Sequence, residues 1–251
     1  MNSELTAQQA MRYSRQVLLA GFDLDKQEVL TNSRALIIGV GGLGCAASQY
    51  LVASGIGKLT LVDDDVVELT NLQRQILHTE NNVGNAKVDS AVEALRPINS
   101  DVEIASLQQR LSEVDLEKLV RKHDIVLDCT DNLESRNLIN RVCYGNQIAL
   151  VSGAAIRMEG QIFSVQPTKK SACYACISHY FGEQNLSCVE AGVMSPLVGI
   201  IGAMQALEAI KIMTDYGQPL FNRLQLFDAM SGSWHELVVN RREDCQVCQS
   251  I

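Results

Sequence analysis

Four cysteines fall into two C-x-x-C pairs, a spacing typical of metal ligands. Cys173 and Cys176 form one pair, and Cys245 and Cys248 form the other. Paired thiolates can both face one tetrahedral Zn²⁺, and two such pairs complete a four-cysteine structural site. The pairs are further apart than in a compact zinc finger, so we expect a zinc staple that ties the carboxyl tail to the body. Redox-active pairs are the alternative, which is disfavoured because neither pair follows a first strand as in thioredoxin-like folds.

The unpaired cysteines have other settings. Cys188 lies in the polar segment FGEQNLSCVEAGV, which predicts a loop, so it is a reactive thiolate or an incidental one. Cys45, Cys129 and Cys143 are expected to be buried thiols that act as small hydrophobes.

A glycine-rich turn nearer the amino end predicts a nucleotide site. Gly39, Gly41 and Gly44 follow the apolar run 35–38 at G-x-G-x-x-G spacing, and a helical segment comes next. Glycines let the backbone approach a phosphate or ribose, and free amides at a helix start favour anionic oxygen. Asp63 ends a second apolar run about 20 residues later, where a carboxylate can accept hydrogen bonds from ribose hydroxyls. A tight turn without a ligand is the alternative, but the strand, helix and acid together favour a nucleotide.

A polar segment, DDDVVELTNLQRQ, begins at Asp63 and holds many hydrogen-bonding side chains. A surface loop is the commoner fate of such a segment. Near Asp63, however, Arg74 could bind a phosphate in fork geometry. Lys87 lies in the first turn of the helix expected over 84–95, where a cation opposes the helix dipole. A nearby anion would explain this lysine, and a solvated side chain is the alternative.

Acidic side chains also follow the apolar run 125–127. Asp128, Asp131 and Asn132 come at its carboxyl end, where ligands bind in open α/β sheets. A carboxylate there can hold Mg²⁺ against a polyphosphate. For Asp131, an Asx turn or the N-cap of a helix beginning near Glu134 is an equally good interpretation.

These residues require a sheet to position them. Short apolar runs alternate with helical segments up to about residue 150, which predicts parallel strands, whereas the later segments IALVSGAA, GQIFSVQ, RLQLFDA and SWHELVV predict mixed or antiparallel strands. We therefore expect one α/β domain over 1–251 with a Rossmann-like sheet, parallel at first and mixed or antiparallel later. Residues 30–150 form the nucleotide-binding half, and residues 151–251 form the mixed-sheet half with the zinc site.

A capping-box pattern at Thr6 predicts the first helix. We expect it to carry Arg12 and Arg15 and to end before Gly21. Two arginines on such a helix usually form a solvated face, and they become important only if a phosphate lies opposite.

The apolar segment 196–213 is long enough to be tested as a membrane span. Gln205, Glu208 and Lys211 recur in it every three residues and form one polar stripe. The stripe is too costly for a single span in lipid, so we expect a mostly buried core helix with Ser195 as its N-cap.

The composition limits the partners. The 251 residues carry a formal net charge of -8, which disfavours nucleic acid and anionic membranes and favours a protein or small-molecule partner. The first residues are polar and lack the apolar core of a signal peptide. We therefore expect a soluble, cytoplasmic protein whose cysteines stay reduced.

Taken together, these motifs resemble the MoeB/ThiF family of sulfur-carrier adenylyltransferases, which is related to ubiquitin-activating enzymes. The resemblance rests on GVGGLG, the segment with NLQRQ, Lys87, DCTDN, SCVEAG and the two C-x-x-C pairs. It extends from Arg12 to the last cysteine pair. Residues 152–161, SGAAIRMEGQ, look more like the molybdopterin branch than the thiamine branch.

The resemblance implies that ATP adenylates the carboxyl-terminal glycine of a small ubiquitin-like carrier that ends in Gly-Gly. The products are an acyl-adenylate and pyrophosphate. The expected carrier is the small subunit of molybdopterin synthase, in molybdenum cofactor biosynthesis, and the carrier of thiamine biosynthesis is the alternative. The sequence ends at Ile251 without the rhodanese-like domain of some relatives, so a separate sulfurtransferase or cysteine desulfurase is expected to supply sulfur.

The resemblance also implies individual roles. Gly42 and Asp63 hold the adenosine, Arg74 and Lys87 contact the phosphates together with Asn71, and Asp131 positions Mg²⁺ and the reacting phosphate. The residues expected to bind ATP are Gly39, Gly41, Gly42, Gly44, Asp63, Asp65, Asn71, Gln73, Arg74, Lys87, Asp131 and Asn132.

Two further implications concern other chains. Arg15 matches an arginine that reaches the triphosphate from the other subunit, which implies a homodimer with two shared active sites. Cys188 matches a loop cysteine that links covalently to the carrier or the sulfur donor in some members and is dispensable in others. The mixed-sheet half is the expected carrier-binding surface.

Two other classes of protein compete with this interpretation. An NAD-dependent dehydrogenase uses the same glycine turn, but it needs a substrate domain where this chain has its zinc staple. A catalytically silent scaffold would dock a carrier without adenylating it. The presence of Arg15, Arg74, Lys87 and Asp131 argues against the scaffold.

Overall fold

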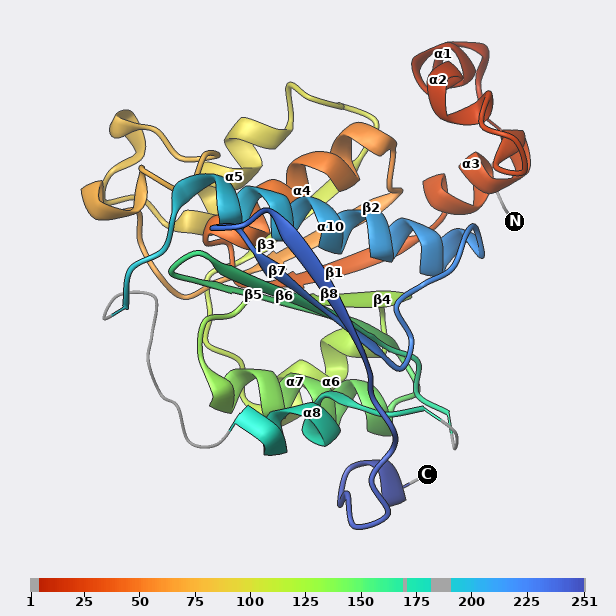
Figure 1. Ribbon diagram of the computed structural model, residues 1–251. Helices are drawn as coiled ribbons and strands as arrows, with labels where there is room; N and C mark the ends of the chain where they lie inside the picture. Colours follow the sequence, from red (N-terminus) through yellow and green to blue (C-terminus); the bar gives the residue numbers. More distant parts are fainter. Residues whose placement is uncertain (1–4, 169–170, 182–190, 251) are drawn as a thin grey trace.

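Figure 1 shows a computed structural model of the chain, which describes residues 5–168, 171–181 and 191–250. A mixed β-sheet crosses it, with helices on both faces. In the described part of the chain the sheet has eight strands, in the order β3-β2-β1-β4-β5-β6-β7-β8. The strands are β1 (Arg34–Ile38), β2 (Lys58–Val62), β3 (Glu103–Leu107), β4 (Ile125–Asp128), β5 (Ala149–Ile156), β6 (Glu159–Val165), β7 (Arg223–Asp228) and β8 (Ser233–Val238).

Strand direction changes halfway across the sheet. The pairs from β3 through β2, β1 and β4 to β5 are parallel. The pairs from β5 through β6 and β7 to β8 are antiparallel. Parallel neighbours need a crossover, usually a helix, whereas antiparallel neighbours can be joined by a tight turn, which explains why the helical segments cluster in the first part of the chain. The predicted α/β sheet, parallel at first and antiparallel later, is confirmed.

Helices cover the two faces of the sheet in two groups. α4 and α10 lie against each other on one face, and α6, α7 and α8 lie on the other (Figure 1). The helices are α1 (Ala7–Arg12), α2 (Ser14–Val17), α3 (Asp23–Thr31), α4 (Gly42–Ser54), α5 (Lys87–Leu95), α6 (Glu113–Val120), α7 (Leu133–Gly145), α8 (Tyr174–Phe181) and α10 (Ser195–Thr214), with short 3-10 turns η1 (Leu69–Asn71), η2 (Glu80–Asn82) and η3 (Cys248–Ser250).

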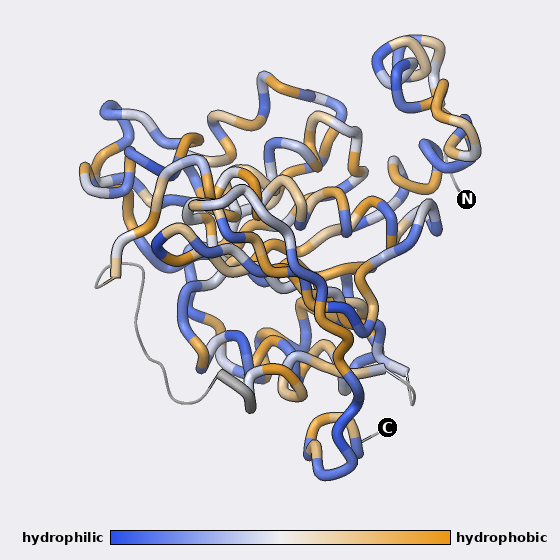
Figure 2. The backbone as a smooth tube through the Cα atoms, in the orientation of Figure 1, coloured by the Kyte–Doolittle hydropathy of each residue, from blue (hydrophilic) through white to orange (hydrophobic). Residues whose placement is uncertain are grey.

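The central strands are apolar because they are buried on both faces. In β1, Ala35 and Ile37 pack into the core beneath α4 and α10, whereas Leu36 packs into the core beneath α6 and α7. This alternation follows from the two-residue period of a strand. Figure 2 shows the resulting apolar segments in the interior of the molecule.

The apolar helix α10 packs onto α4 and onto β5 and β6. It has the length and composition of a membrane span, and half of its apolar window is buried in the structure. Its polar residues point inward: Gln205 Nε2 donates to the Asp128 carbonyl at 2.7 Å, and Glu208 Oε2 accepts from the Leu220 amide at 2.7 Å. The segment is a core helix as predicted, but half of its apolar window is buried where the sequence predicted that most of it would be. The predicted N-cap is wrong by one residue, since Met194 is the N-cap and Ser195 begins the helix.

The amino-terminal helix begins as predicted but ends earlier. Thr6 and Gln9 form the expected capping box, and α1 then stops at Tyr13 instead of continuing toward Gly21. The buried Tyr13 ring lies against Gly55, where a Cβ atom would overlap it, and the Tyr13 hydroxyl accepts a hydrogen bond from Asn99 Nδ2 at 2.8 Å. This contact turns the chain, so that Arg15 falls on the separate short helix α2.

The helix predicted over 84–95 begins later, at Lys87. Gly84 adopts φ +91°, and Ala86 is the extended N-cap, so neither has helical geometry. Lys87 is therefore in the first turn of α5, as predicted.

Candidate functional site

The glycine turn joins β1 to α4. Gly39 has φ +93°, and a Cβ atom there would lie 2.7 Å from the Cys129 carbonyl oxygen. A Cβ atom on Gly44 would overlap the Gly39 carbonyl. Only glycine fits both positions, and the turn therefore packs tightly against the loop that follows β4.

The start of α4 offers free backbone donors. Gly41 is the N-cap, and no side chain among the described residues caps the helix through it. The first-turn amides of such a helix favour an anion. Gly42 also packs closely on α10, since a Cβ atom there would lie 2.6 Å from Val198 Cγ2.

Asp63 anchors this turn from the end of β2. Its Oδ2 accepts a hydrogen bond from the Val40 amide at 2.6 Å, and its Oδ1 accepts one from the Asp65 amide at 2.9 Å. Burial raises the pKa of the Asp63 carboxyl, while the Lys87 charge and these two hydrogen bonds oppose the rise. Each carboxylate oxygen keeps a further acceptor site, which could receive a ribose hydroxyl.

The polar segment after β2 brings a buried cation to the same end of the sheet. Lys87 is buried, and its Nζ lies 2.8 Å from Asp65 Oδ2. Arg74 is partly exposed and donates from Nη1 to the Thr70 carbonyl at 3.1 Å, which leaves other guanidinium donors available. Gln73 is exposed.

Asn71 has a local structural role. It is buried, and its Oδ1 accepts a hydrogen bond from the Glu68 amide at 3.1 Å, which closes the η1 turn. The sequence predicted a phosphate contact for Asn71 from the resemblance, and this turn holds the neighbouring Gln73 and Arg74 in place.

The loop after β4 shows which residue caps α7 and which is available to a metal ion. Asn132 is the N-cap of α7, because its Oδ1 accepts from the Ser135 amide at 2.9 Å. The N-cap interpretation of Asp131 is therefore wrong. Asp131 is exposed beside the cap, and its carboxylate is available to a cation.

Asp128 is a buried structural carboxylate. It accepts hydrogen bonds from Ser152 Oγ at 2.7 Å and from Thr130 Oγ1 at 2.6 Å. The buried Arg136 on α7 lies 3.5 Å from Asp128 Oδ2 and also donates to the Thr130 carbonyl. This network fixes the loop that carries Asp131.

Three buried residues near the site were missed by sequence reasoning: Arg136, Gln75 and His78. Gln75 lies against Gly41, and its Oε1 has no hydrogen-bond partner among the described residues. A buried acceptor without a partner is costly, so a ligand donor or water at this position would stabilise it. Only the position of Gln75 immediately after Arg74 could have drawn attention to it.

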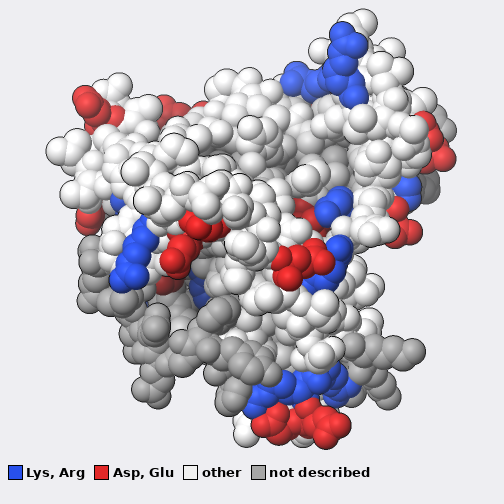
Figure 3. All heavy atoms as spheres, viewed as in Figure 1, with Lys and Arg blue, Asp and Glu red and all other residues white. Residues whose placement is uncertain are grey.

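Arg15 is not brought to this site within one chain. It lies on α2, beside Tyr13, and Tyr13 packs on Gly55 at the end of α4. The glycine turn is at the opposite end of that helix, about 20 Å away for thirteen residues. Figure 3 shows Lys and Arg atoms on the amino-terminal helices, at one upper corner of the view. An arginine side chain cannot bridge that distance.

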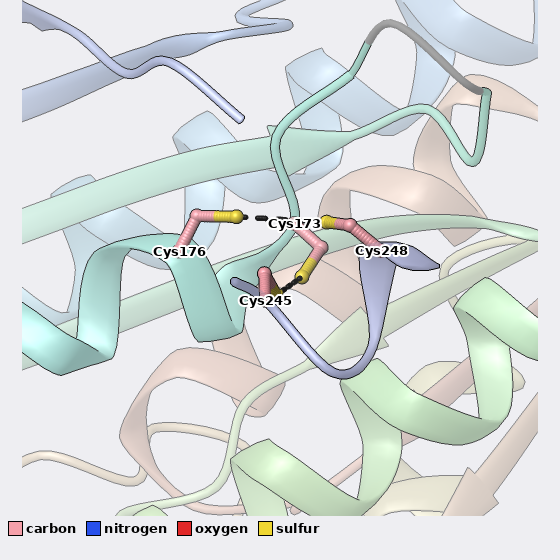
Figure 4. A group of neighbouring side chains, drawn as sticks. All are labelled: Cys173, Cys176, Cys245 and Cys248. Atoms are coloured by element: carbon pink, nitrogen blue, oxygen red, sulfur yellow. Dashed lines mark hydrogen bonds between the residues drawn. The ribbon is translucent and has the colours of Figure 1, made fainter. Parts of the chain in front are cut away.

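The two cysteine pairs converge as predicted. All four thiols are buried, and their sulfur atoms lie within 4.8 Å of one another (Figure 4). The Cys173 and Cys245 sulfurs are 3.7 Å apart, and the Cys176 and Cys248 sulfurs are 3.5 Å apart. Tetrahedral zinc with bonds of about 2.3 Å requires sulfur separations of about 3.8 Å, so the cluster fits the metal. All four sulfurs gather at one point instead of forming two separate pairs, which favours one shared metal over two redox pairs.

A side chain on α7 supports this cluster. Asn140 Nδ2 donates to Cys173 Sγ at 3.5 Å, and Asn140 Oδ1 accepts from the Tyr174 amide at 2.9 Å. A neutral hydrogen-bond donor beside a thiolate fixes its orientation and stabilises its negative charge. A metal bound here would join the carboxyl tail to α8, because the two pairs come from those two segments.

The remaining cysteines agree with the prediction where the structure describes them. Cys45, Cys129 and Cys143 are buried, and burial raises the pKa of the Cys45 thiol to about 12. Such thiols are unreactive near neutral pH. Cys188, the candidate reactive thiol, lies outside the described residues.

Comparison with known proteins places these sites in context. The ThiF family matches residues 13–247. The chain is 50% identical to the molybdopterin-synthase adenylyltransferase of Escherichia coli K12 over 246 residues, which covers 98% of this chain and 99% of that protein. It is 42% identical to the sulfur carrier protein ThiS adenylyltransferase of the same organism, which covers 95% of this chain and 94% of that protein.

Solved structures show the same fold. The structure of E. coli MccB with ATP superposes with a TM-score of 0.83 at 26% identity, and the match covers 94% of this chain and 74% of that one. The glycine turn, the polar segment and the first cysteine pair all lie inside the residues that the family matches. The chain therefore belongs to the ThiF family.

Proposed function

We propose that this chain is an adenylyltransferase that activates the carboxyl-terminal glycine of a small ubiquitin-like sulfur carrier, and that the carrier is the small subunit of molybdopterin synthase. The observation that carries the proposal is the 50% identity to a molybdopterin-synthase adenylyltransferase over 98% of the chain. The lower identity of 42% to a ThiS adenylyltransferase makes the thiamine carrier the second candidate. Both relatives are named as adenylyltransferases, which leaves the dehydrogenase interpretation without support.

The reaction joins a carboxylate to a phosphate. A carboxylate oxygen of the carrier forms a bond to the α-phosphorus of ATP, and the bond between the α- and β-phosphates breaks to release pyrophosphate. The enzyme must align the two groups and stabilise the negative charge that develops on the phosphates.

The site residues have matching capacities. The free amides at the start of α4 and the Asp63 carboxylate are suited to hold the nucleotide, with Gly39, Gly41, Gly42 and Gly44 shaping the turn. Lys87 and Arg74 supply positive charge for the phosphates. The exposed Asp131 carboxylate would hold Mg²⁺, which shields phosphate charge when it is bound. The other residues assigned to the ATP site are Asp65, Asn71, Gln73 and Asn132.

The cysteine cluster is proposed to hold Zn²⁺ as a structural metal. Cys173, Cys176, Cys245 and Cys248 would supply four thiolates and leave no open coordination position for a substrate. This arrangement supports the proposed division into a nucleotide-binding half, 30–150, and a mixed-sheet half, 151–251, within one domain.

The active site is proposed to form in a homodimer. Arg15 cannot reach the glycine turn of its own chain, so it can act only on a second copy. The amino-terminal helices also expose apolar side chains to solvent, with Met11 78% and Leu18 74% exposed. Exposed apolar side chains of this kind mark a protein interface. A second copy of the chain would bury them and would place Arg15 at the partner's active site.

The proposed partners are proteins. The carrier would dock on the mixed-sheet half, and a separate sulfurtransferase or cysteine desulfurase would load it with sulfur. The proposed reactive thiol, Cys188, would take part in that later step. Neither nucleic acid nor a membrane is a proposed partner, and a cytoplasmic location is proposed.

The test measures the reaction directly. Purified protein is incubated with ATP, Mg²⁺ and either the molybdopterin-type or the thiamine-type carrier, and pyrophosphate release and the intact mass of each carrier are recorded. Adenylation of the molybdopterin-type carrier is the expected result. Adenylation of the thiamine-type carrier alone would correct the pathway, and no adenylation of either carrier would favour a scaffold.

A further inference from the structure

Two side chains, the half-buried Asp63 and the buried His78, hold the two peptide units that flank Val40 in the glycine turn. The Val40 amide donates to Asp63 Oδ2 at 2.6 Å. The Val40 carbonyl oxygen lies 3.2 Å from His78 Nε2 and also accepts from Cys45 Sγ at 3.5 Å. Val40 has glycines on both sides, and glycine allows a peptide unit to rotate at little cost. The hydrogen bonds are therefore what fix these two peptide units.

The partners of His78 define its tautomer. A carbonyl oxygen can only accept, so Nε2 must carry the proton. Nδ1 then accepts from Ser90 Oγ, which lies 2.9 Å away on α5. Ser90 is one helical turn after Lys87, and His78 and Ser90 are both buried. One imidazole ring thus connects the glycine turn to the helix that begins with Lys87.

We propose that His78 is a positioning residue for nucleotide binding, acting through the peptide unit between Val40 and Gly41. In a trans peptide the carbonyl and the next amide point in opposite directions. By holding the Val40 carbonyl inward, His78 turns the Gly41 amide toward the open start of α4, where the phosphates are expected. This inference rests on the proposed ATP site at the glycine turn.

Another buried histidine provides a matched control. His123 is as buried as His78, with 5% of its surface exposed in each case. Its Nδ1 lies 2.7 Å from the Leu119 carbonyl, and its Nε2 lies 2.8 Å from Thr60 Oγ1. His123 therefore has the opposite tautomer from His78, and both of its ring nitrogens are also hydrogen-bonded. It lies before the first residue of β4, whereas the Asp131 loop follows the last residue of that strand.

The test uses the full chain with ATP and Mg²⁺ as the probe, and isothermal titration calorimetry measures the dissociation constant. We expect His78→Ala to weaken ATP binding about tenfold, the effect of losing one hydrogen bond that orients a ligand donor. His78→Gln should restore affinity to within about threefold, because the Gln amide can reach the position of Nε2. His78→Asn should not restore it, because its shorter amide overlies Nδ1.

The control variant separates positioning from folding. His123→Gln should lower the melting temperature, since it disturbs a buried pair of hydrogen bonds, and should leave the ATP dissociation constant within about twofold of wild type. Nitrogen-15 NMR of the wild-type histidines should show a proton on Nε2 of His78 and on Nδ1 of His123.

The failures are distinguishable. Wild-type protein that does not bind ATP overturns the proposed nucleotide site itself. If wild type binds ATP and His78→Ala binds it equally well, the positioning role is wrong. The positioning role is also wrong if the His78 and His123 variants lose ATP affinity in the same proportion to their loss of melting temperature. A proton on Nδ1 of His78 would contradict it as well.

Discussion

Lys87 Nζ donates to Asp65 Oδ2 across 2.8 Å, although the lysine side chain is 8% exposed and the aspartate 66%. Because Asp65 is open to water, the pair itself contributes little stability, about 1 kcal/mol or less. The cation is therefore held at the site without being neutralised by a buried partner.

We expect Lys87→Met to raise the ATP dissociation constant at least about tenfold, because it removes a charged hydrogen bond to phosphate. Stability should change by less than about 1 kcal/mol, since the remaining carboxylate is solvated. Calorimetric titration with ATP and urea unfolding measure the two effects. Lys58→Met is the control, because Lys58 pairs with Glu103 on the surface at the opposite end of β2. Equal affinities for both variants would contradict the phosphate role.

Asp131→Asn should slow pyrophosphate release about 100-fold or more, because it removes the carboxylate proposed to hold Mg²⁺. The melting temperature should stay unchanged, since the side chain is exposed and Asn132 supplies the cap of α7. The carrier-dependent release of pyrophosphate is the measurement. Asp101→Asn, an exposed aspartate just before β3, should behave as wild type. Normal turnover of Asp131→Asn would remove Asp131 from the mechanism.

Cys176→Ala should abolish metal retention, because three thiolates cannot complete the tetrahedral site. The metal content of dialysed protein, measured by atomic absorption, checks this directly, and the tail should become sensitive to protease. Cys143→Ala removes an equally buried thiol outside the cluster and should keep the metal, at a cost of about 1 kcal/mol or more for the cavity. A zinc content that is the same in both variants and in wild type would contradict the four-cysteine site.

Mixing two inactive variants tests the shared active site. In Arg15→Ala every site lacks the arginine, and in Asp131→Asn every site lacks the carboxylate. If each site combines Asp131 from one chain with Arg15 from its partner, half of the dimers in an equal mixture are mixed, and each has one intact site. Pyrophosphate release should then recover to about a quarter of wild type. Absence of recovery after proven subunit exchange would rule out action in trans.

Acid should destabilise the protein through two buried histidines, His78 and His123. Burial lowers the pKa of both His78 and His123 in the folded state, with Lys87 adding to the effect at His78 and Arg34 and Lys58 adding to it at His123. Two effects oppose this lowering of the pKa. They are the hydrogen bonds from the rings to backbone carbonyls and the charges of the nearby Asp63 and Asp124 carboxylates.

Because the unfolded chain binds these protons more readily, stability is complete above the unfolded pKa of 6.5 and falls as the pH drops below it. The slope is at most about 1.4 kcal/mol per pH unit for each histidine. Urea unfolding between pH 7 and pH 5 measures it, and His123→Gln should reduce the slope. An unchanged slope in that variant would show that other groups dominate.

The sequence predicted the features that depend on local pattern. The strands were located to within a few residues because buried strands need continuous apolar runs, and the turn at Gly39 was visible because only glycine permits it. The cysteine cluster was predicted because ligand spacing is itself the signal.

Features that join distant parts of the chain could not be predicted in this way. The Arg136 contact with Asp128, the His78 contact with Val40 and the unpartnered Oε1 of Gln75 each depend on three-dimensional packing. The same is true of the break at Tyr13, which exists because Gly55 leaves room for the ring.

The inward-facing Gln205 amide and Glu208 carboxylate of α10 also affect how the chain folds during synthesis. Gln205 bonds to carbonyls on β4 and β5, and Glu208 bonds to Ser164 on β6, so these three partners are synthesised before the helix. The Leu220 amide, which also donates to Glu208, is synthesised after it. Synthesis proceeds from the amino end, and the receiving face can be assembled when the helix leaves the ribosome. A segment apolar enough to attract lipid thus finds most of these partners already synthesised, which shortens the time for which it is exposed.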